Sequence, residues 1–150
     1  MKSTKINIHK AVSQELNKRI VRIEKSLKDY KEGLLSESNS SAGDKHNTSR
    51  AMMHLEEEKL RNQLLQFSKI NKVLHGINST VEHDKITLGS LVNTDKGWLY
   101  IAIPLGKVDV GEIDVMVISL ASPIGQALQG KSVHDTFKLN NICWEVKKVL

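Results

Sequence analysis

The stretch Ser119–Lys131, which reads S-L-A-S-P-I-G-Q-A-L-Q-G-K, decides most about the fold of this chain. A strand is expected to end at Leu120. Ser122 is typical of a helix N-cap, because its hydroxyl can accept a hydrogen bond from a backbone N–H of the first turn, and Pro123 suits the first helical position. Gly130 is expected to end the helix after about two turns. The segment therefore predicts a short helix that directly follows a strand.

Short apolar runs and alternating patterns on both sides of this segment predict strands. Asn140 and Asn141 separate the last two strands and suit a tight turn, since Asn tolerates positive φ. The expected strands are Ile86–Asn93, Trp98–Ile103, Asp114–Leu120, Thr136–Leu139 and Ile142–Val149. Residues 84–150 are therefore predicted to form a small antiparallel sheet domain that carries one short helix.

Residues 1–80 have a different pattern, with apolar residues at alternating spacings of four and three, which predicts two helices of coiled-coil type. The polar segment Ser36–Gly43 between them is too short for anything except a turn, so the helices should form an antiparallel hairpin with its tip near residues 36–48. The apolar positions are Leu16, Ile20, Ile23, Leu27, Tyr30 and Leu34, then Met53, Leu60, Leu64, Phe67, Ile70, Leu74 and Ile77. Each arm would be about 35 to 45 Å long. The expected fold class is α+β.

The composition argues against several classes of functional site. Aromatic residues make up 4% of the 150 residues, which argues against a deep aromatic-lined ligand pocket. Cys143 is the only cysteine, so an intramolecular disulfide and a multi-cysteine zinc site are both excluded. The sequence has no run of about 18 apolar residues and no apolar signal-peptide segment near its start. We therefore expect a cytoplasmic protein without a membrane partner.

The positive charge is concentrated in the first half of the chain. Of the formal net charge of +5, residues 1–78 carry 15 Lys and Arg against 9 Asp and Glu, whereas residues 79–150 carry 7 against 8. A basic helical half is compatible with a nucleic-acid or acidic-protein partner, and a solvated helical face gives the same count. The charge alone leaves both interpretations open.

The segment S-P-I-G-Q-A-L-Q-G-K resembles a signature of the GreA/GreB-type bacterial transcript elongation factors, S-P-I-x-x-A-L-x-G-K. Leu88-Gly89-Ser90 and the closing W-E-V-K-K-V-L are also similar to that family, and the order of a helical hairpin before a small sheet domain agrees with its plan. Ser41–Asp44 leading into Arg50–Met53 resembles the tip of the hairpin, closest to a short Bacteroidetes subgroup. The resemblance implies an FKBP-like fold for residues 84–150.

The same resemblance implies a partner and a mode of action. Gre factors are accessory proteins rather than enzymes: they bind RNA polymerase, insert the hairpin through its secondary channel, and meet nucleic acid or DNA only within the transcription complex. Acidic tip residues help to hold a Mg²⁺ ion shared with the polymerase, which then cleaves backtracked RNA. Mg²⁺ prefers carboxylate oxygens, and a metal-activated water can attack the phosphodiester. No cofactor is expected on the isolated chain, which we expect to be a monomer.

The tip residues match the family pattern only in part. Asp44 stands at the first acidic position and is the expected catalytic and metal-binding carboxylate, but Asn47 stands three residues later, where the family has Glu. An amide oxygen can bind Mg²⁺ without contributing charge, and Lys45 has the wrong sign to attract a cation. Glu37, across the turn, could replace the missing carboxylate if the turn brings it close. Asp44 would equally serve as a helix N-cap.

Partner contacts are expected on the short helix, where the resemblance places Ser122, Pro123 and Ile124 on the face that binds the rim of the polymerase channel. Asn47 would contact the polymerase at the tip. The alternatives are a regulator that occupies the channel without stimulating cleavage, an FKBP-like chaperone, and a coiled-coil adaptor. The chaperone would need several aromatic residues around an apolar pocket, and the adaptor would form concentration-dependent oligomers.

Overall fold

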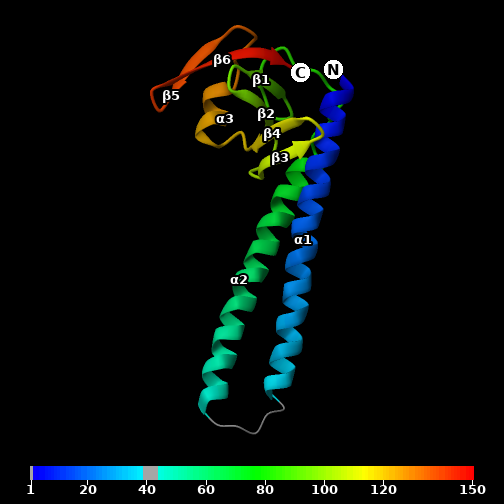
Figure 1. Cartoon of the computed structure of the whole chain (residues 1–150), viewed down its shortest axis with the longest axis vertical. Coiled ribbons are helices and arrows are strands. Elements are labelled where there is room, and N and C mark those ends of the chain that lie inside the picture. Colours follow the sequence, from blue (N-terminus) through cyan, green and yellow to red (C-terminus); the bar gives the residue numbers. More distant parts are fainter. Residues whose placement is uncertain (1, 39–43) are drawn as a thin grey trace. The chain divides into compact units, whose positions relative to one another are not determined.

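The computed structural model describes residues 2–38 and 44–150, with side chains for residues 2–33 and 49–150. Its elements are two long helices, α1 (Lys2–Ser38) and α2 (Asp44–His75), followed by strands β1 (Leu91–Thr94), β2 (Gly97–Ile101), β3 (Gly106–Val110) and β4 (Ile113–Ile118), the short helix α3 (Pro123–Leu128), and strands β5 (Thr136–Leu139) and β6 (Ile142–Val149). Figure 1 labels these elements along the chain. The α+β fold class is confirmed.

The chain forms two compact units. One combines Met1–Glu15 with Ile70–Leu150, and the other is Leu16–Lys69. Both long helices contribute residues to both units, because the first turns of α1 and the last turns of α2 pack within the sheet-bearing unit. The sequence predicted a domain boundary between residues 80 and 84, where the helical pattern gives way to strands. That this point separates two domains stays a prediction.

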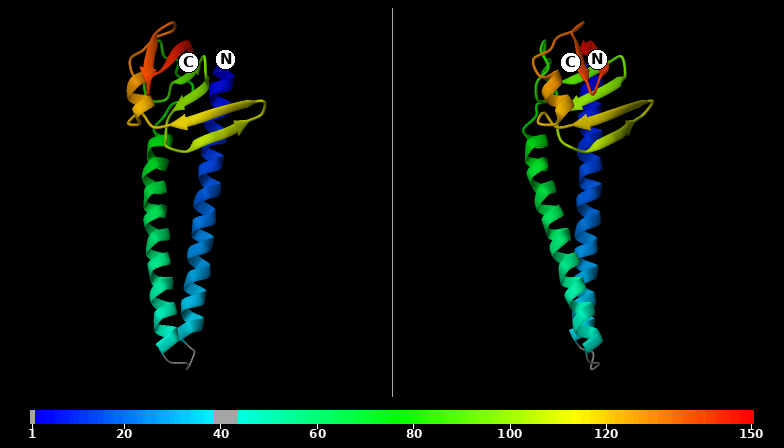
Figure 2. Two further views of the ribbon diagram at one scale, coloured as in Figure 1. Left: turned by 60° about the vertical axis from the view of Figure 1, so that its left-hand side comes forward. Right: turned by 90° about the vertical axis from the view of Figure 1, so that its left-hand side faces the viewer.

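The unit Leu16–Lys69 is a pair of helices that run side by side, as the views of Figures 1 and 2 agree. Members of the predicted stripes are less exposed than the residues next to them: Leu16 and Leu27 are buried on α1, and Leu60, Leu64 and Phe67 are half-buried between exposed neighbours on α2. The helices contain 37 and 32 residues, or about 55 and 48 Å, so they are longer than expected. For α1, the difference arises because the helix begins at Lys2, well before Leu16, the first residue of its predicted stripe.

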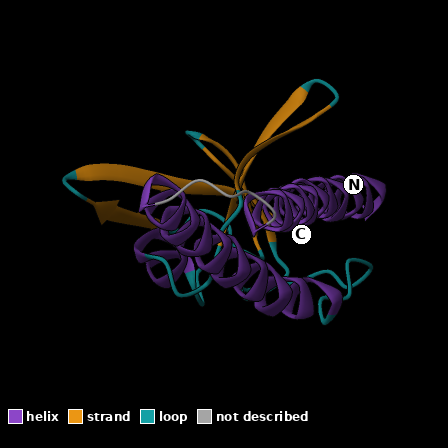
Figure 3. Ribbon diagram, turned by 90° about the horizontal axis from the view of Figure 1, so that it is seen from below, coloured by secondary structure: helices purple, strands orange, loops and turns teal. Residues whose placement is uncertain are grey.

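The sheet has six strands in the order β3-β4-β2-β1-β6-β5. All neighbouring pairs are antiparallel except β2 and β4, which run parallel with Trp98 opposite Val115. The prediction of a wholly antiparallel sheet is therefore wrong at this pair. The cause is β3, which returns the chain before β4 and was not predicted. Figure 3 shows the strong twist of the sheet, and in Figure 2 the β3–β4 and β5–β6 hairpins extend in different directions.

The core of this unit lies on the face of the sheet that α3 covers. Its buried members are Ile86, Val92, Leu99, Ile101, Leu128 and Val146. The partly buried residues packed against them are Ile118, Leu120, Ile124, Phe137, Trp144 and Val149. Burial of apolar surface at about 25 cal/mol per Å² is what stabilises such a unit. The unit also buries Ile8 and Val12 of α1 and the phenol ring of Tyr100. None of the helices in the described parts of the chain is both long and apolar enough to cross a membrane.

Candidate functional site

The first turn of α3 forms as the sequence predicts. Ser122 is the N-cap, with φ −65° and ψ 157°, and its Oγ accepts a hydrogen bond from the Gly125 N–H at 3.1 Å. The same hydroxyl donates to the Ser119 carbonyl oxygen at 2.7 Å. Pro123 occupies the first helical position and is exposed, and Gly130 follows the helix with φ +81°. Because both hydrogen-bonding roles of the Ser122 hydroxyl are used locally, Pro123 is the more available of the two residues for a partner.

Gly125 is the residue that lets the chain turn so tightly from β4 into α3. It is buried, and a Cβ atom built on it would lie 2.3 Å from the Ser119 carbonyl oxygen and 2.7 Å from that of Leu120. Both neighbours are backbone atoms, which cannot move aside as the end of a flexible side chain can. The close approach fixes where α3 begins and therefore where Pro123 and Ile124 lie.

Beside α3 the sheet carries an open groove of about 410 Å³. Met116, which is 43% exposed, forms part of its wall, and the half-buried Ile118 and Ile124 continue it. The other lining residues are Lys96, Gly97, Trp98, Leu99, Lys107, Asp114, Val115 and Trp144. Ile124, a predicted partner-binding residue, thus belongs to an apolar concavity with charged edges. Surfaces of this kind are typical of binding sites for apolar side chains.

Trp144 of β6 is one of the residues that line the groove. Its indole Nε1 is buried and has no hydrogen-bond partner among the described residues. The ring stacks on Phe137 with 5.9 Å between ring centroids and 10° between ring planes, while the Lys96 ammonium lies 5.5 Å from the indole centroid. A buried unpaired N–H costs about 1–3 kcal/mol, so an incoming carbonyl oxygen that reached it would be stabilised.

The charged edge of the groove comes from the β3–β4 hairpin. Lys107 Nζ lies 3.2 Å from Asp114 Oδ2, and this hydrogen bond raises the pKa of the Lys107 ammonium. Asp109 pairs with Asp114 across the two strands. The hydrogen bond between their side chains raises the pKa of Asp109 and, together with Lys107, lowers the pKa of Asp114. Of the two carboxyl groups, Asp114 therefore loses its proton at the lower pH, and it lies beside the Lys107 ammonium.

The predicted tip residues fall where the structure describes the backbone only. Glu37 lies in the last turn of α1, and α2 begins at Asp44, so that Asn47 belongs to the first turn of α2. The side chains of these three residues, and residues 39–43 between the helices, lie outside the described part of the chain. The expected approach of Glu37 to Asp44, and the Mg²⁺ role of Asp44, stay predictions.

A polar network holds the first turns of α1 to the sheet-bearing unit, and the sequence did not predict it. Lys5 is fully buried, and its ammonium donates to the carbonyl oxygens of Val81 and Leu150. Burial lowers the pKa of Lys5, with the Glu82 charge acting in the opposite direction. His9 Nδ1 lies 2.7 Å from the Tyr100 hydroxyl. Burial is also the main reason why the pKa of His9 is lowered.

The groove beside α3 was missed because its residues come from separate strands. Met116 lies on the same face of β4 as Asp114 and Ile118, opposite to the buried Val115 and Val117, and this alternation was the available signal. Nothing in the sequence placed Trp144 next to it. Among the side chains that the structure describes, no three histidine, cysteine, aspartate or glutamate residues form a group that could hold a metal ion.

Comparison with solved structures finds similarity to a transcription factor. No protein-family profile matches this sequence, and no curated protein matches it. A solved structure of the transcription factor Gfh1 aligns with 93% of this chain and 94% of its own, with 21% sequence identity and a TM-score of 0.37. The low TM-score does not establish a common fold.

Proposed function

We propose that this chain is a Gre-like accessory factor that acts with bacterial RNA polymerase in the cytoplasm, and that it has no catalytic activity of its own. The observation that carries the proposal is a pair of long helices, α1 and α2, whose connection falls between the acidic residues Glu37 and Asp44. Two long helices whose connection is flanked in the sequence by acidic residues would suit insertion into a narrow channel that leads to a metal-dependent active site. The S-P-I-x-x-A-L-x-G-K resemblance supports the same proposal.

Docking at the channel rim would use α3 and the groove beside it. Pro123 is exposed, and Ile124 and Met116 offer apolar surface to a partner side chain. The Lys107–Asp114 pair would set the orientation at the edge, since rim charges contribute specificity more than affinity. In this proposal α3 binds the polymerase, and the residues around the connection between α1 and α2 act at its active site.

At the tip, Asp44 would contribute one carboxylate oxygen to a Mg²⁺ ion held mainly by the polymerase. Mg²⁺ is a hard cation that prefers carboxylate and water ligands. The missing acid at position 47 removes one negative charge from this place, and Lys45 weakens the local attraction further. Stimulation of RNA cleavage therefore depends on Asp44, assisted by Glu37.

The second candidate function is occupation of the channel without cleavage, and Asn47 is the specific observation that favours it. A factor of this kind would block access of other factors and slow transcription. It requires the same docking surface but no metal ligand. The two versions therefore differ only in the reaction that follows binding.

The decisive experiment uses purified polymerase stalled on a backtracked RNA. We expect the full chain to bind, and the Asp44→Ala variant to bind equally well but to lose at least about tenfold in the rate of RNA cleavage, because a metal ligand is lost. Asp29→Ala, which removes an exposed carboxylate elsewhere on α1, is the matched control and should retain the rate. Binding without cleavage by the unmodified chain would favour the channel-occupying version.

The docking surface is tested in the same binding assay. Met116→Glu places a charge in the groove and should weaken binding to polymerase about tenfold or more, whereas Val133→Glu changes a side chain of similar exposure outside the groove and should not. If the unmodified chain fails to bind any form of the cognate polymerase, the proposed function is wrong.

A further inference from the structure

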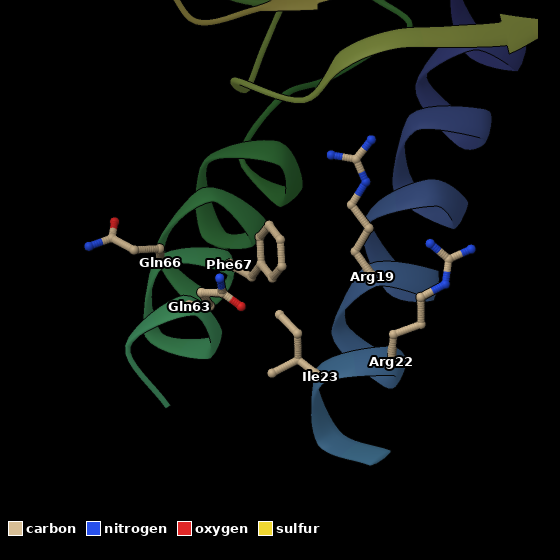
Figure 4. A pocket seen from close by; sticks show the side chains of 6 residues that line it. All are labelled: Arg19, Arg22, Ile23, Gln63, Gln66 and Phe67. Carbon is tan, nitrogen blue, oxygen red and sulfur yellow. The ribbon is translucent and has the colours of Figure 1, made fainter. Parts of the chain in front are cut away.

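The two helices of the unit Leu16–Lys69 leave a cleft of about 360 Å³ between them. Figure 4 shows Ile23 of α1 and Phe67 of α2 pointing toward each other across the cleft. Both side chains are only half-buried, so apolar surface stays accessible at this level. The other residues that line the cleft are Arg19, Arg22, Gln63 and Gln66.

A second hollow of about 420 Å³ lies along α2 and shares Gln63 and Gln66 with the cleft. Leu55, which is 65% exposed, is its apolar member. The other residues that line it are Glu58, Lys59 and Asn62. Leu55 and Phe67 are separated by about 18 Å along the axis of α2. The cleft and the hollow together form an elongated surface with apolar residues near both ends, which we call the helix-pair groove.

The helix-pair groove is basic. Arg19, Arg22 and Lys59 line it, whereas Glu58 is the only acidic residue among its described members. Arg22 and Lys59 are exposed, and neither takes part in an ion pair or a hydrogen bond with the described residues. The unit around the groove has the same sign, because residues 16–33 and 49–69 contain ten Lys and Arg against six Asp and Glu. Charge complementarity therefore favours an acidic partner over a second copy of this chain.

The backbone of α1 and α2 restricts the conformation of such a partner. Inside a helix the N–H and C=O groups bond to each other, so the groove presents side chains and no free backbone edge. An extended peptide would leave its own backbone groups unpaired over the apolar part of the groove, which is unfavourable. A helix pairs these groups internally, and its apolar face suits a groove between two neighbouring helices.

We propose that the helix-pair groove binds an acidic amphipathic helix of a partner protein. One apolar side chain of that helix enters the cleft between Ile23 and Phe67, and another, about three turns away, packs on Leu55. Carboxylates on the two sides of this apolar stripe pair with Arg22 of α1 and Lys59 of α2. The inference goes beyond the proposed function and does not depend on it. If the helix pair enters a channel, a helix bound here would compete with that entry.

The test is the binding of a labelled peptide to the full chain, followed by fluorescence anisotropy. The peptide has about 18 residues, with Leu at the a and d positions of its heptads and Glu or Ala elsewhere. The control peptide has Lys in place of every Glu. We expect the acidic peptide to bind at least about tenfold more tightly than the basic one, with a difference that decreases as the salt concentration rises. Equal binding of the two peptides, or no binding of the acidic one up to millimolar protein, overturns the proposal.

A charge variant tests the pairing with α1. Arg22→Glu should weaken binding of the acidic peptide about tenfold or more, because it replaces an attraction by a repulsion. Lys28→Glu is the matched control: Lys28 is exposed on α1 and lines neither the cleft nor the hollow, so the same change of charge should alter binding less than about threefold. Equal effects of the two variants would contradict a specific contact at Arg22.

An apolar variant tests the other end of the groove. Leu55→Gln should weaken binding about fivefold or more, since it removes an apolar contact. Val21→Gln should not, because Val21 is 61% exposed on α1 and lines neither the cleft nor the hollow. Circular dichroism of each variant checks that the helices remain intact.

Nuclear magnetic resonance locates the bound peptide. The backbone amide signals around Ile23 and Phe67 should shift on binding, while those of the strands should not. Shifts confined to the strands would overturn the proposal. Sedimentation equilibrium without peptide tests the other occupant: self-association that Arg22→Glu and Leu55→Gln both reduce would assign the groove to a second copy and would also overturn it. None of these measurements involves RNA polymerase, so their outcome is separate from that of the proposed function.

Discussion

Gly125 allows α3 to begin close to the end of β4. A Cβ atom at this position would lie 2.3 Å from the Ser119 carbonyl oxygen. The constraint is steric and does not involve positive φ. Ala is usually preferred to Gly in a helix by about 1 kcal/mol. At this site the clash with two backbone carbonyl groups outweighs that preference.

We therefore expect Gly125→Ala to lower the free energy of unfolding by about 1–3 kcal/mol, because the start of α3 must shift away from β4. Urea denaturation followed by tryptophan fluorescence measures the change. Gly76→Ala is the control: a Cβ there would lie 3.4 Å from its nearest neighbour, the Val73 carbonyl oxygen, an ordinary contact. Equal stability of the two variants would contradict the steric argument.

At the scale of the element, the β5–β6 hairpin is determined by its turn. Asn140 and Asn141 have φ of 53° and 65°, the left-handed values that a two-residue hairpin turn needs, and Leu139 pairs with Ile142 across it. Residues other than Gly, Asn and Asp adopt this conformation at a cost of about 1–2 kcal/mol each. The turn therefore sets the register of the whole hairpin.

This geometry predicts opposite effects for two substitutions at position 141. Asn141→Val should lower the free energy of unfolding by about 1–2 kcal/mol, since a β-branched residue is strained at positive φ. Asn141→Gly should be neutral or slightly stabilising, because Gly adopts this φ without a steric penalty. Chemical denaturation of both variants gives the comparison, and a loss of stability with Gly as large as that with Val would refute the assignment to backbone strain.

An element could be predicted from the sequence when the interactions that determine it join residues close together in the chain. The bounds of β5 and β6 were predicted correctly, because the turn residues Asn140 and Asn141 lie directly between the two strands in the sequence. The expected strand Ile86–Asn93 begins only at Leu91, since Ser90 N–H donates to the Thr87 carbonyl and Gly89 has φ +89°, which makes a turn. At residues 86–90, hydrogen bonds within the turn outweigh the strand propensity of the sequence.

Strand β3 was missed for a related reason. Its sequence G-K-V-D-V alternates, but only Val108 is fully buried, and charged residues fill the exposed face. An edge strand with one buried side chain gives a weak pattern. Its stability comes instead from pairing with β4, which is a contact that sequence periodicity does not report.

In the candidate site, too, the local features were predictable from the sequence and the features that join distant segments were not. The cap at Ser122 and the start of α3 at Pro123 depend on residues within one turn of each other, and they are confirmed. The groove next to Ile124 depends on Met116 and Trp144, which come from strands at different positions in the sheet. The buried Lys5 is a third case: lysine is rarely buried, and only the carbonyl groups of two distant segments make its burial possible.

At the scale of the whole molecule, the half-buried imidazoles of His9 and His83 couple stability to pH. Burial lowers the pKa of His9 and of His83, and the charges of Lys5 and, for His9, of His75 act in the same direction. The unfolded chain binds a proton at each histidine near pH 6.5, whereas the folded chain stays neutral there. The stability that comes from keeping His9 and His83 neutral is present above about pH 6.5, and it falls as the pH decreases below that value.

We expect the thermal midpoint to decrease between about pH 7 and pH 5, and His9→Gln to reduce the steepness of that decrease, because one proton-linked group is removed. Differential scanning calorimetry at several pH values measures both. His54→Gln, which replaces a histidine whose side chain is 62% exposed, is the comparison variant. An identical pH dependence in His9→Gln and the unmodified chain would exclude His9 as a source.

The hydrogen bond from Lys5 to the Leu150 carbonyl joins residues 145 positions apart, and this separation has a consequence for how the protein is made. A ribosome adds Lys5 long before Leu150, so the first turns of α1 emerge before the segment that accepts this hydrogen bond exists. Ile8 and Val12, which are buried in the folded unit, stay exposed to solvent until the strands of that unit have been synthesised. During this interval the apolar residues of α1 can bind other chains, and we expect the nascent protein to depend on chaperones then rather than after folding.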